Sequence, residues 1–146
     1  TKADLREGLV GLAHVQLCRG QILAGNLQVT ECHDDFQQRM DEAGLTWTCT
    51  CNACVIKDSL DLKFVVHHGG YFVQSIGAHT EVLGPDVTVV HRLLKNAAAD
   101  RTGSTAYALF TDAAEIALAL ELDNAVRFTE PIEGAEPVDV VAIALG

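Results

Sequence analysis

The sequence predicts an α+β fold, in which strands form a sheet and helices pack over one face. Residues 61–96 contain, in order, an alternating apolar segment, two adjacent glycines, a second apolar segment and an amphipathic helix pattern. A further short apolar segment lies directly before a helix-capping pattern at residues 112–115. The chain has 146 residues, 49% of them hydrophobic, which is enough for one core. We therefore expect residues 1–146 to form a single domain.

The N-terminal part of the chain is expected to be helical. Leucines between Lys2 and Leu23 favour one helical face, although the glycines of this segment oppose a helix. A regular apolar stripe then predicts a helix over residues 28–43, with Gly44 placed as the glycine after its end. The stripe consists of Val29, Cys32 or His33, Phe36 and Met40.

A β-hairpin is predicted after this helix. Apolar residues alternate over residues 62–67, which is the period of a strand with one face more buried than the other. Gly69 and Gly70 would supply the positive φ angles of a tight turn, and residues 71–76 would form the returning strand.

A second helix is predicted to follow the hairpin. It starts at Gly84-Pro85-Asp86, because proline is tolerated at the first helical position and the carboxylate faces the positive end of the helix dipole. Its buried stripe is expected to consist of Val87, Val90, His91 and Leu94, and a second stripe of Thr88, Arg92 and Lys95.

The C-terminal third is predicted to add strands and one helix. Small and polar residues indicate a loop over residues 96–104. The Asp112-x-x-Glu115 pattern would cap the helix, which is expected to end near Glu121. The expected strands are residues 105–110, 125–128 and 137–145.

Three histidines of the hairpin and helix have structural interpretations. Neighbouring strand residues point to opposite faces, so we expect one of His67 and His68 to be packed and the other exposed. His91 lies on the apolar stripe of its helix and is expected to be a hydrogen-bonded core histidine rather than a ligand.

Three cysteines within six residues are typical of a metal site. Zn²⁺ is tetrahedral with bonds of about 2.3 Å to sulfur, so a structural zinc site needs a fourth ligand besides Cys49, Cys51 and Cys54. Cys32 or His33, on the preceding predicted helix, is the expected fourth ligand. The alternatives are reduced cysteines in a loop, and a redox pair formed by Cys51 and Cys54.

Composition argues against several classes of partner. The net charge is −10 and the 10 basic residues are scattered, which opposes nucleic-acid binding. No apolar run approaches the roughly 20 residues of a membrane span, and the N-terminus lacks the order of a signal peptide. Five cysteines, an odd number, fit a reducing compartment better than a disulfide framework. We therefore expect a cytoplasmic protein that binds neither nucleic acid nor membrane.

Two of these motifs resemble the class III nucleotidyl cyclase domain. Residues 65–69 (VVHHG) are similar to a strand end of that family, and residues 84–92 (GPDVTVVHR) to the motif that starts its helix. The match is closer to an uncharacterised bacterial family of cyclase-like domains, which carries a C-x-C-x-x-C run and ends the helix as residues 91–96 (HRLLKN) do. The resemblance covers about residues 29–129 and implies a ferredoxin-like core.

The resemblance also implies site residues. In cyclases an Arg of the helix motif reaches the triphosphate, and its counterpart is Arg92, whereas the Asn that reaches the ribose is replaced by Thr88. Lys95 and Glu81 are the further nucleotide-binding candidates. The two metal-binding Asp motifs of the family are absent from this chain, as if its N-terminal strands were missing, and Thr1 in place of Met would fit a fragment or a processed start.

Three functions are open. The first is a degenerate cyclase-like domain that binds a nucleotide or another ligand without turnover, because the carboxylates that hold catalytic metal ions are absent. The second is an active adenylate or guanylate cyclase, working as a homodimer with Mg²⁺ or Mn²⁺, whose carboxylates lie outside this chain. The third is a zinc-stapled interaction or assembly module whose exposed sheet edge pairs with another chain.

Overall fold

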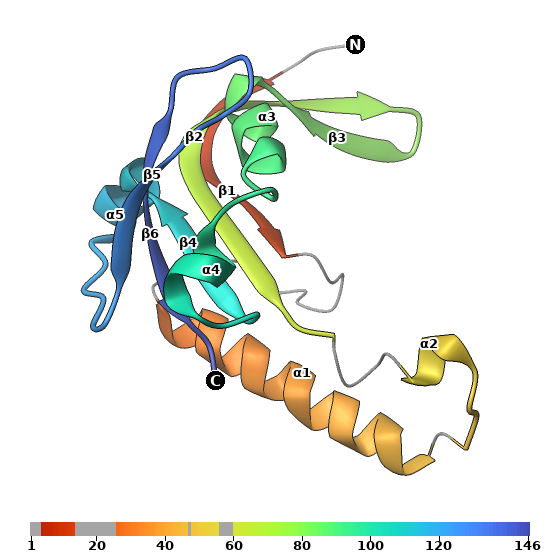
Figure 1. The fold of residues 1–146 in the computed structure, drawn as a ribbon. Helices are drawn as coiled ribbons and strands as arrows, with labels where there is room; N and C mark the ends of the chain where they lie inside the picture. Colours follow the sequence, from red (N-terminus) through yellow and green to blue (C-terminus); the bar gives the residue numbers. More distant parts are fainter. Residues whose placement is uncertain (1–3, 14–25, 47, 56–59) are drawn as a thin grey trace.

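A computed structural model describes residues 4–13, 26–46, 48–55 and 60–146, which form a mixed sheet and its helices (Figure 1). The strands are β1 (Asp4–Ala13), β2 (Lys63–Ile76), β3 (His79–Leu83), β4 (Tyr107–Thr111), β5 (Val126–Glu130) and β6 (Val138–Ala144). The helices are α1 (Asn26–Thr46), α2 (Asn52–Val55), α3 (Pro85–Arg92), α4 (Ala98–Thr102) and α5 (Asp112–Leu118).

The sheet has six strands, in the order β1-β2-β4-β6-β5, and β3 pairs with β2 beside this path. β2 and β4 are parallel, whereas the other pairs are antiparallel. The parallel pair is connected through β3, α3 and α4, as a parallel pairing requires a long crossover. This arrangement confirms the predicted α+β class.

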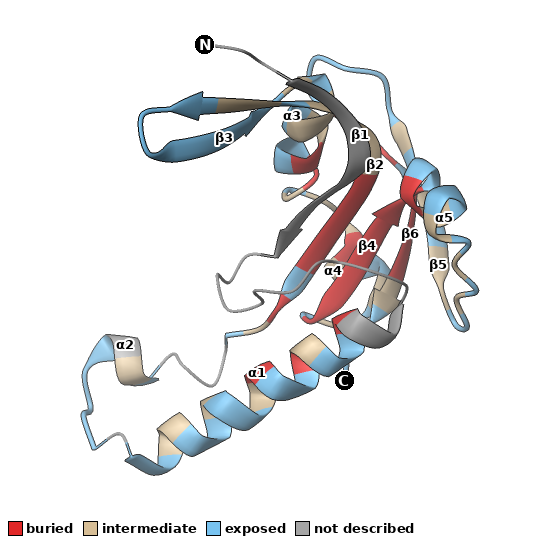
Figure 2. Cartoon of the chain, turned by 180° about the vertical axis from the view of Figure 1, so that it is seen from behind, coloured by how far each residue is buried: buried red, intermediate tan, exposed pale blue. Residues whose placement is uncertain are grey.

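Helices cover both faces of the central strands. Phe64 and Val66 of β2 lie in one hydrophobic core, and Val65 between them lies in another. α1 and α5 cover the first core, for example through Phe36 and Ala114, and α3 and α4 cover the second. The expectation that helices cover one face only is therefore wrong. A central strand with apolar residues on both sides needs cover on both, and the first part of β2, all of β4 and the middle of β6 are accordingly buried (Figure 2).

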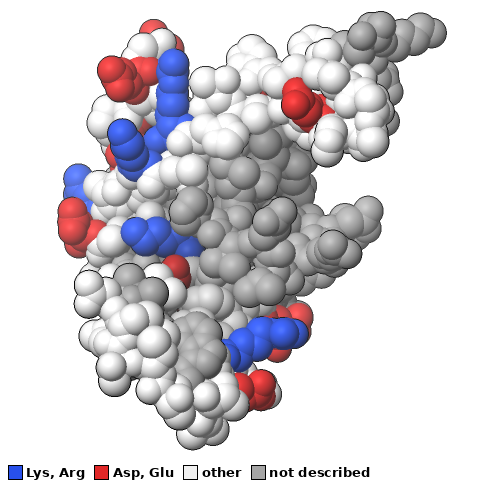
Figure 3. Space-filling view, turned by 90° about the vertical axis from the view of Figure 1, so that its right-hand side faces the viewer, with Lys and Arg blue, Asp and Glu red and all other residues white. Residues whose placement is uncertain are grey.

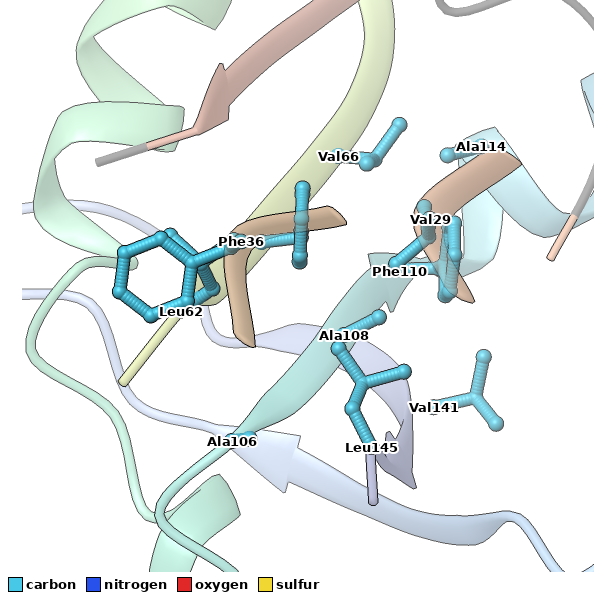
Figure 4. Close-up of a cluster of buried hydrophobic side chains, with 11 residues drawn as sticks. Val29, Phe36, Leu62, Val66, Ala106, Ala108, Phe110, Ala114, Val141 and Leu145 are labelled. Atoms are coloured by element: carbon cyan, nitrogen blue, oxygen red, sulfur yellow. The ribbon is translucent and has the colours of Figure 1, made fainter. Parts of the chain in front are cut away.

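The first core attaches the N-terminal half of α1 to the sheet. Val29 and Phe36 from α1 pack among side chains of β2, β4 and β6, including Phe110 (Figure 4). His33 is also buried, and Met40 is partly buried against the same cluster. The predicted helix is thus confirmed, with its apolar stripe on the sheet. It extends two residues further at its start, and it continues through the predicted terminal glycine to Thr46.

The predicted turn at Gly69 and Gly70 is wrong, because β2 runs through both residues without a break. The chain reverses instead at Gly77, whose φ of 62° is left-handed, and β3 returns along β2. A Cβ atom on Gly69 would lie 2.3 Å from Asp86 Oδ2, and the N–H of Gly70 donates to that same oxygen at 2.6 Å. The two glycines therefore allow the start of α3 to approach the middle of β2.

The N-terminal segment also differs from expectation. The helix expected over residues 2–23 is wrong for the ten residues that form β1, and its other residues lie outside the described part of the chain. β1 pairs antiparallel with β2 along its whole length, so distant backbone hydrogen bonds override the weak local preference for a helix. A strand therefore does precede α1, although the resemblance suggested that the N-terminal strands were missing.

The C-terminal elements are confirmed as β4, β5 and β6, with ends that differ from the prediction by one or two residues. The predicted loop over residues 96–104 contains the short helix α4, which is followed by Gly103 with a left-handed φ of 72°. α5 ends at Leu118 rather than near Glu121, and the Thr111 side chain accepts the N–H of Ala114 at its start. The N-cap is thus the last residue of β4, one position before the predicted pattern.

Candidate functional site

The cysteine run forms a compact group of sulfur atoms. The Sγ atoms of Cys49, Cys51 and Cys54 all lie within 4.8 Å of one another. In a tetrahedral zinc site with bonds of about 2.3 Å, two ligand sulfurs are about 3.8 Å apart, so small side-chain rotations would bring the three to one ion. Cys49 and Cys51 are exposed, and Cys54 is half-buried. The group can therefore hold a metal ion.

Backbone hydrogen bonds form this run into a tight turn. The N–H groups of Cys54 and Val55 both donate to the carbonyl of Cys51, each at 3.0 Å, which creates the single turn of α2. The N–H of Cys51 donates to Cys49 Sγ at 3.4 Å. Such donors stabilise negative charge on sulfur, as a metal-bound thiolate requires.

The cysteine run lies at the far end of α1, away from the sheet (Figure 1). At about 1.5 Å per residue, the 21 residues of α1 span roughly 32 Å, and the cores hold its N-terminal half. Two apolar side chains near the run are exposed, Leu45 at 88% and Val55 at 66%. The candidate metal centre thus sits on a projecting segment with little core of its own.

The structure does not bring Cys32 or His33 to the cysteine run. His33 lies on α1 about 20 Å before the end of the helix, given about 1.5 Å of rise per residue. Cys32 takes part in a disulfide bond, so its sulfur is not available as a thiolate ligand for a metal ion. His33 instead belongs to a hydrogen-bond network around Asp61, just before β2, with its Nε2 3.3 Å from Asp61 Oδ1.

Asp61 is the centre of that network. Its Oδ1 accepts the N–H of Leu62 at 2.9 Å and a bond from Gln37 at 3.4 Å, and its Oδ2 accepts the Thr105 hydroxyl at 2.9 Å. Together with His33, these bonds join α1 to the segment before β2 and to the segment before β4. The network is thus an anchor of α1, which positions the projecting cysteine segment.

Arg92 and Thr88, the two residues matched to the cyclase helix motif, are exposed and make other contacts. Arg92 Nη1 donates to the backbone carbonyl of Glu133 at 2.5 Å, in the turn between β5 and β6. The Thr88 hydroxyl donates to the carbonyl of Gly84 at 3.2 Å, one turn back in its own helix. Both side chains therefore have local partners, which restrict the orientation in which they could meet a ligand.

Lys95 and Glu81 are also exposed, and they lie in different elements. Lys95 follows α3, whereas Glu81 is the middle residue of β3, opposite Gln74 of β2. Within the described residues, no hydrogen bond or ion pair joins any two of Arg92, Thr88, Lys95 and Glu81. Thr88 and Arg92 share one face of α3, being four residues apart, whereas Glu81 lies on a separate strand.

A buried polar group that the sequence analysis did not identify joins β2, β4 and α3. His67 is the packed member of its pair, 9% exposed, and its Nδ1 lies 2.8 Å from Thr111 Oγ1. Its Nε2 lies 3.5 Å from Asp86 Oδ1, while Asp86 Oδ2 accepts the N–H of Gly70. Asp86 therefore fastens α3 to β2 besides facing the helix dipole. The two glycines beyond the histidines were the available signal, because they mark a close approach.

His91 and His68 both differ from the burial that the sequence predicted for them. His91 is exposed, so its assignment to the core is wrong. Leu93, two positions further on, is fully buried instead, because it lies three residues after the buried Val90 on the same face of the helical turn. His68 is half-buried rather than exposed.

A cavity of about 340 Å³ lies between α5 and the last two strands. Arg127 donates to both carboxylate oxygens of Glu115, with one bond of 2.6 Å. The Thr129 hydroxyl donates to Asp139 at 2.6 Å. The lining residues are Asp112, Glu115, Arg127, Phe128, Thr129, Asp139 and Val140.

The charges of this cavity oppose phosphate binding. Hydrogen bonding from Arg127 lowers the pKa of Glu115, and the same bond raises the pKa of Arg127. The guanidinium is thus neutralised by Glu115, and Asp112 and Asp139 leave the lining with net negative charge. The sequence pattern indicated Glu115 only as a helix cap, and nothing in the sequence linked it to Arg127.

Charged side chains of both signs are interspersed on one face of the molecule (Figure 3). On the face drawn in Figure 3, lysine and arginine side chains lie among acidic and uncharged ones and form no continuous basic patch among the described residues. Among the helices of the described ranges, none has both the length and the apolar character needed to cross a membrane.

Fold and site together define an α+β domain with a candidate thiolate metal centre on a projecting segment. The chain belongs to the family "Protein of unknown function (DUF2652)", which matches residues 21–102. The matched region contains the cysteine run and residues 91–96, on which the sequence analysis based its resemblance to an uncharacterised family. That identification is confirmed.

Two individual proteins are similar to the chain. An uncharacterised protein of Mycobacterium tuberculosis, Rv2561/Rv2562, is 35% identical over 78 residues, which are 49% of this chain and 37% of that protein. The crystal structure of the adenylyl cyclase CyaB from P. aeruginosa has a TM-score of 0.48 and 14% sequence identity, over 82% of this chain and 55% of the cyclase chain. The chain thus spans well under two thirds of either protein.

Proposed function

We propose that this protein is a zinc-stapled assembly module. Cys49, Cys51 and Cys54 supply three of the four ligands of a structural zinc ion, and the exposed edge of the sheet pairs with a second copy of the chain. The observation that carries the proposal is the grouping of the three cysteine sulfurs within 4.8 Å. Thiolates are the characteristic ligands of structural zinc. Among the described residues, no carboxylate or imidazole joins this group as a general base, which favours a structural ion over a catalytic one.

The position of the run explains what zinc would contribute. α2 has four residues, and Val55 at its end is exposed, so apolar burial contributes little to the order of this segment. A short segment without a core is commonly held by a metal or a disulfide. Zinc bound here would hold the connection between α1 and β2 while the sheet core remains independent of it.

Metal analysis of the purified full-length chain tests the site. We expect about one zinc ion per chain, as one three-cysteine group among the described residues implies. The variants Cys49→Ser, Cys51→Ser and Cys54→Ser should each lose the metal, whereas Thr50→Ser, between the ligands, should retain it. Chelation should leave the thermal unfolding of the sheet nearly unchanged. A zinc content far below one per chain in protein purified without chelator would refute the site.

The exposed edge that supports assembly is β3. All five of its residues are exposed, and among the described residues it pairs with β2 alone. The hairpin carries four exposed large apolar side chains, Phe72, Ile76, Val82 and Leu83. Unpaired strand edges with apolar side chains pair readily with another strand, and an antiparallel pairing of two identical edges is compatible with twofold symmetry.

Molar mass in solution tests the assembly. We expect a dimer for the wild type and a monomer for Val82→Lys, because a lysine on an edge strand opposes strand addition. Val82→Thr, which keeps a β-branched side chain, is the matched control and should remain dimeric. A wild-type chain that stays monomeric at high concentration would remove the assembly half of the proposal and leave the zinc half intact.

Nucleotide binding without turnover receives less support from the geometry. Thr88 and Arg92 do share a helix face, being four residues apart. Arg92 Nη1 donates to Glu133 and the Thr88 hydroxyl donates to Gly84, so a nucleotide would bind through the remaining N–H groups of Arg92 and the lone pairs of Thr88. Turnover would further need metal-binding carboxylates from outside this chain.

A further inference from the structure

Cys51 and Cys54 are placed so that a disulfide can form between them. Their sulfur atoms are 3.5 Å apart. A disulfide bond is about 2.05 Å long, so closing it needs roughly 1.5 Å of relative movement. The turn of α2 holds both residues, because the Cys51 carbonyl accepts the N–H of Cys54. Side-chain rotation could therefore supply the movement without unfolding the turn.

Cys49 is less suited to form a disulfide with Cys51 or with Cys54. Its sulfur accepts the N–H of Cys51 at 3.4 Å, so one lone pair of that sulfur is less available for bonding to another sulfur. A disulfide from Cys49 to Cys51 would also close a ring with one residue between the cysteines, which leaves little freedom for the required dihedral angle. Cys51 is exposed and Cys54 is half-buried, so an oxidant from solvent reaches Cys51 first.

We propose that this cysteine group is an oxidation-sensitive switch, in which a hydroperoxide converts Cys51 and Cys54 to a disulfide and the zinc ion is released. The inference depends on the zinc site proposed above. It adds the class of reactant that acts on the site, and it assigns different roles to the three cysteines. Cys51 is the attacking thiolate, Cys54 is the resolving thiolate, and Cys49 is a ligand that remains reduced.

The reaction balances with hydrogen peroxide as the oxidant. The Cys51 thiolate attacks one peroxide oxygen, so an S–O bond forms, the O–O bond breaks, and the departing hydroxide takes a proton to become water. The Cys54 thiolate then attacks the sulfenic sulfur, so the S–S bond forms and a second hydroxide leaves and becomes water. Two electrons pass from the two sulfurs to the peroxide, and each sulfur is oxidised by one.

Release of the metal follows from the loss of two ligands. Disulfide sulfur is not a thiolate, and the thiolate is the form that binds zinc. Of the three cysteines, Cys49 alone would then remain as a ligand. The change is confined to the projecting end of α1, where Leu45 and Val55 are already exposed. Oxidation would thus alter this surface without entering either hydrophobic core.

The test treats the zinc-loaded, full-length protein with hydrogen peroxide and follows zinc with a chromogenic chelator while thiols are titrated. We expect one zinc ion released for every two thiols lost, and peptide mapping should show a Cys51–Cys54 crosslink. Reductant with added zinc should restore the metal. In the Cys49→Ser variant, which lacks one ligand, the same crosslink should still form.

The results that would contradict the oxidation switch differ from the result that would contradict the zinc site. Protein that contains zinc but keeps it after peroxide has oxidised a reference dithiol would overturn the switch and leave the zinc site standing. Release accompanied by sulfinic acid, or by a crosslink through Cys49, would also overturn it. Protein that never contains zinc would refute the proposed metal site itself. Peptide mapping also separates these products from the disulfide of Cys32.

Discussion

β3 and β4 have the same length and share a neighbour, yet their environments are opposite. Each has five residues, and each pairs with β2. All five residues of β4 are buried, whereas all five of β3 are exposed. Helices cover β4 from both sides, while the hairpin that contains β3 extends beyond them (Figure 2).

The formation of a strand and its burial in the core depend on different contacts. Backbone pairing is sufficient to make a strand, but burial depends on what packs above and below it. β2 shows both conditions in one element: residues 64–67 are buried, and Phe72 and Ile76 are exposed. Stability should therefore be concentrated in β4 and the first half of β2, and the second half of β2 with β3 remains available for interaction.

The largest expected effect is a substitution in β4. Phe110 is 1% exposed, so Phe110→Ala should lower the free energy of unfolding by about 3–5 kcal/mol through lost burial and a cavity. Leu83→Ala in β3, where the side chain is 45% exposed, should cost at most about 1 kcal/mol. Urea denaturation measures both values.

A more conservative substitution in β4 allows the same comparison with Leu83→Ala if Phe110→Ala does not fold. Phe110→Leu keeps an apolar side chain and should cost less than about 1.5 kcal/mol if the core repacks. Equal losses for Phe110→Leu and Leu83→Ala, both well under that value, would show that burial does not distinguish the two strands.

The second prediction concerns Gly69, at the boundary between the two halves of β2. A Cβ atom at this position would overlap the carboxylate of Asp86, so Gly69→Ala should destabilise the protein by about 1–3 kcal/mol by pushing α3 away. Gly77→Asn is the control, because its Cβ would meet nothing within 4 Å and asparagine tolerates the left-handed φ. Thermal unfolding compares them, and a harmless Gly69→Ala would contradict the close approach.

A smaller effect is expected at Arg92, whose hydrogen bond ties α3 to the turn between β5 and β6. Arg92→Ala should cost about 1 kcal/mol in the absence of any ligand, because a hydrogen bond to a backbone carbonyl is lost. Lys95→Ala, at a neighbouring exposed position, is the matched control and should be neutral. Thermal unfolding with and without ATP or GTP gives the readout.

The same experiment tests the nucleotide alternative. The proposed function assigns no nucleotide contact to Arg92, so we expect nucleotides to change the unfolding temperature of the wild type and of Arg92→Ala equally. A nucleotide-dependent stabilisation that is present in the wild type and lost in Arg92→Ala would instead support a phosphate contact.

The smallest predicted effect is the pH dependence of the Glu115–Arg127 ion pair. The guanidinium lowers the pKa of Glu115 in the folded state, so the stabilisation is present above the ordinary glutamate value of about 4.3. It is lost as pH falls through the lowered folded-state value. Compared with Glu115→Gln, the wild type should lose more stability between about pH 5 and 3. Parallel curves for the two proteins would show that this exposed pair contributes nothing measurable.

Much of the fold could be predicted where the signal is local. The stripe from Val29 to Met40 predicted α1, Pro85 marked the start of α3, and the apolar C-terminal segments predicted three strands. Helix periodicity, caps and strand alternation operate over a few residues, so they are visible in the sequence. The cysteine group was predictable for the same reason, because its three ligands lie within six residues.

The candidate nucleotide site shows the opposite case. Arg92 was placed correctly on its helix, but its hydrogen-bond partner Glu133 lies 41 residues away. His33 was correctly placed on the buried stripe of α1, yet it binds Asp61, 28 residues further along the chain. No local pattern reports which of many acceptors a side chain meets.

The sequence by itself determined the α+β class, the positions of most elements and the spacing of the three cysteines. Tertiary structure alone decided that residues 4–13 form a strand, that Gly69 and Gly70 admit α3 rather than turn the chain, and that helices cover both faces of the sheet. The physical reason is that each of these outcomes depends on contacts between segments far apart in the chain. Their energy exceeds the fraction of a kilocalorie per residue by which local preferences differ.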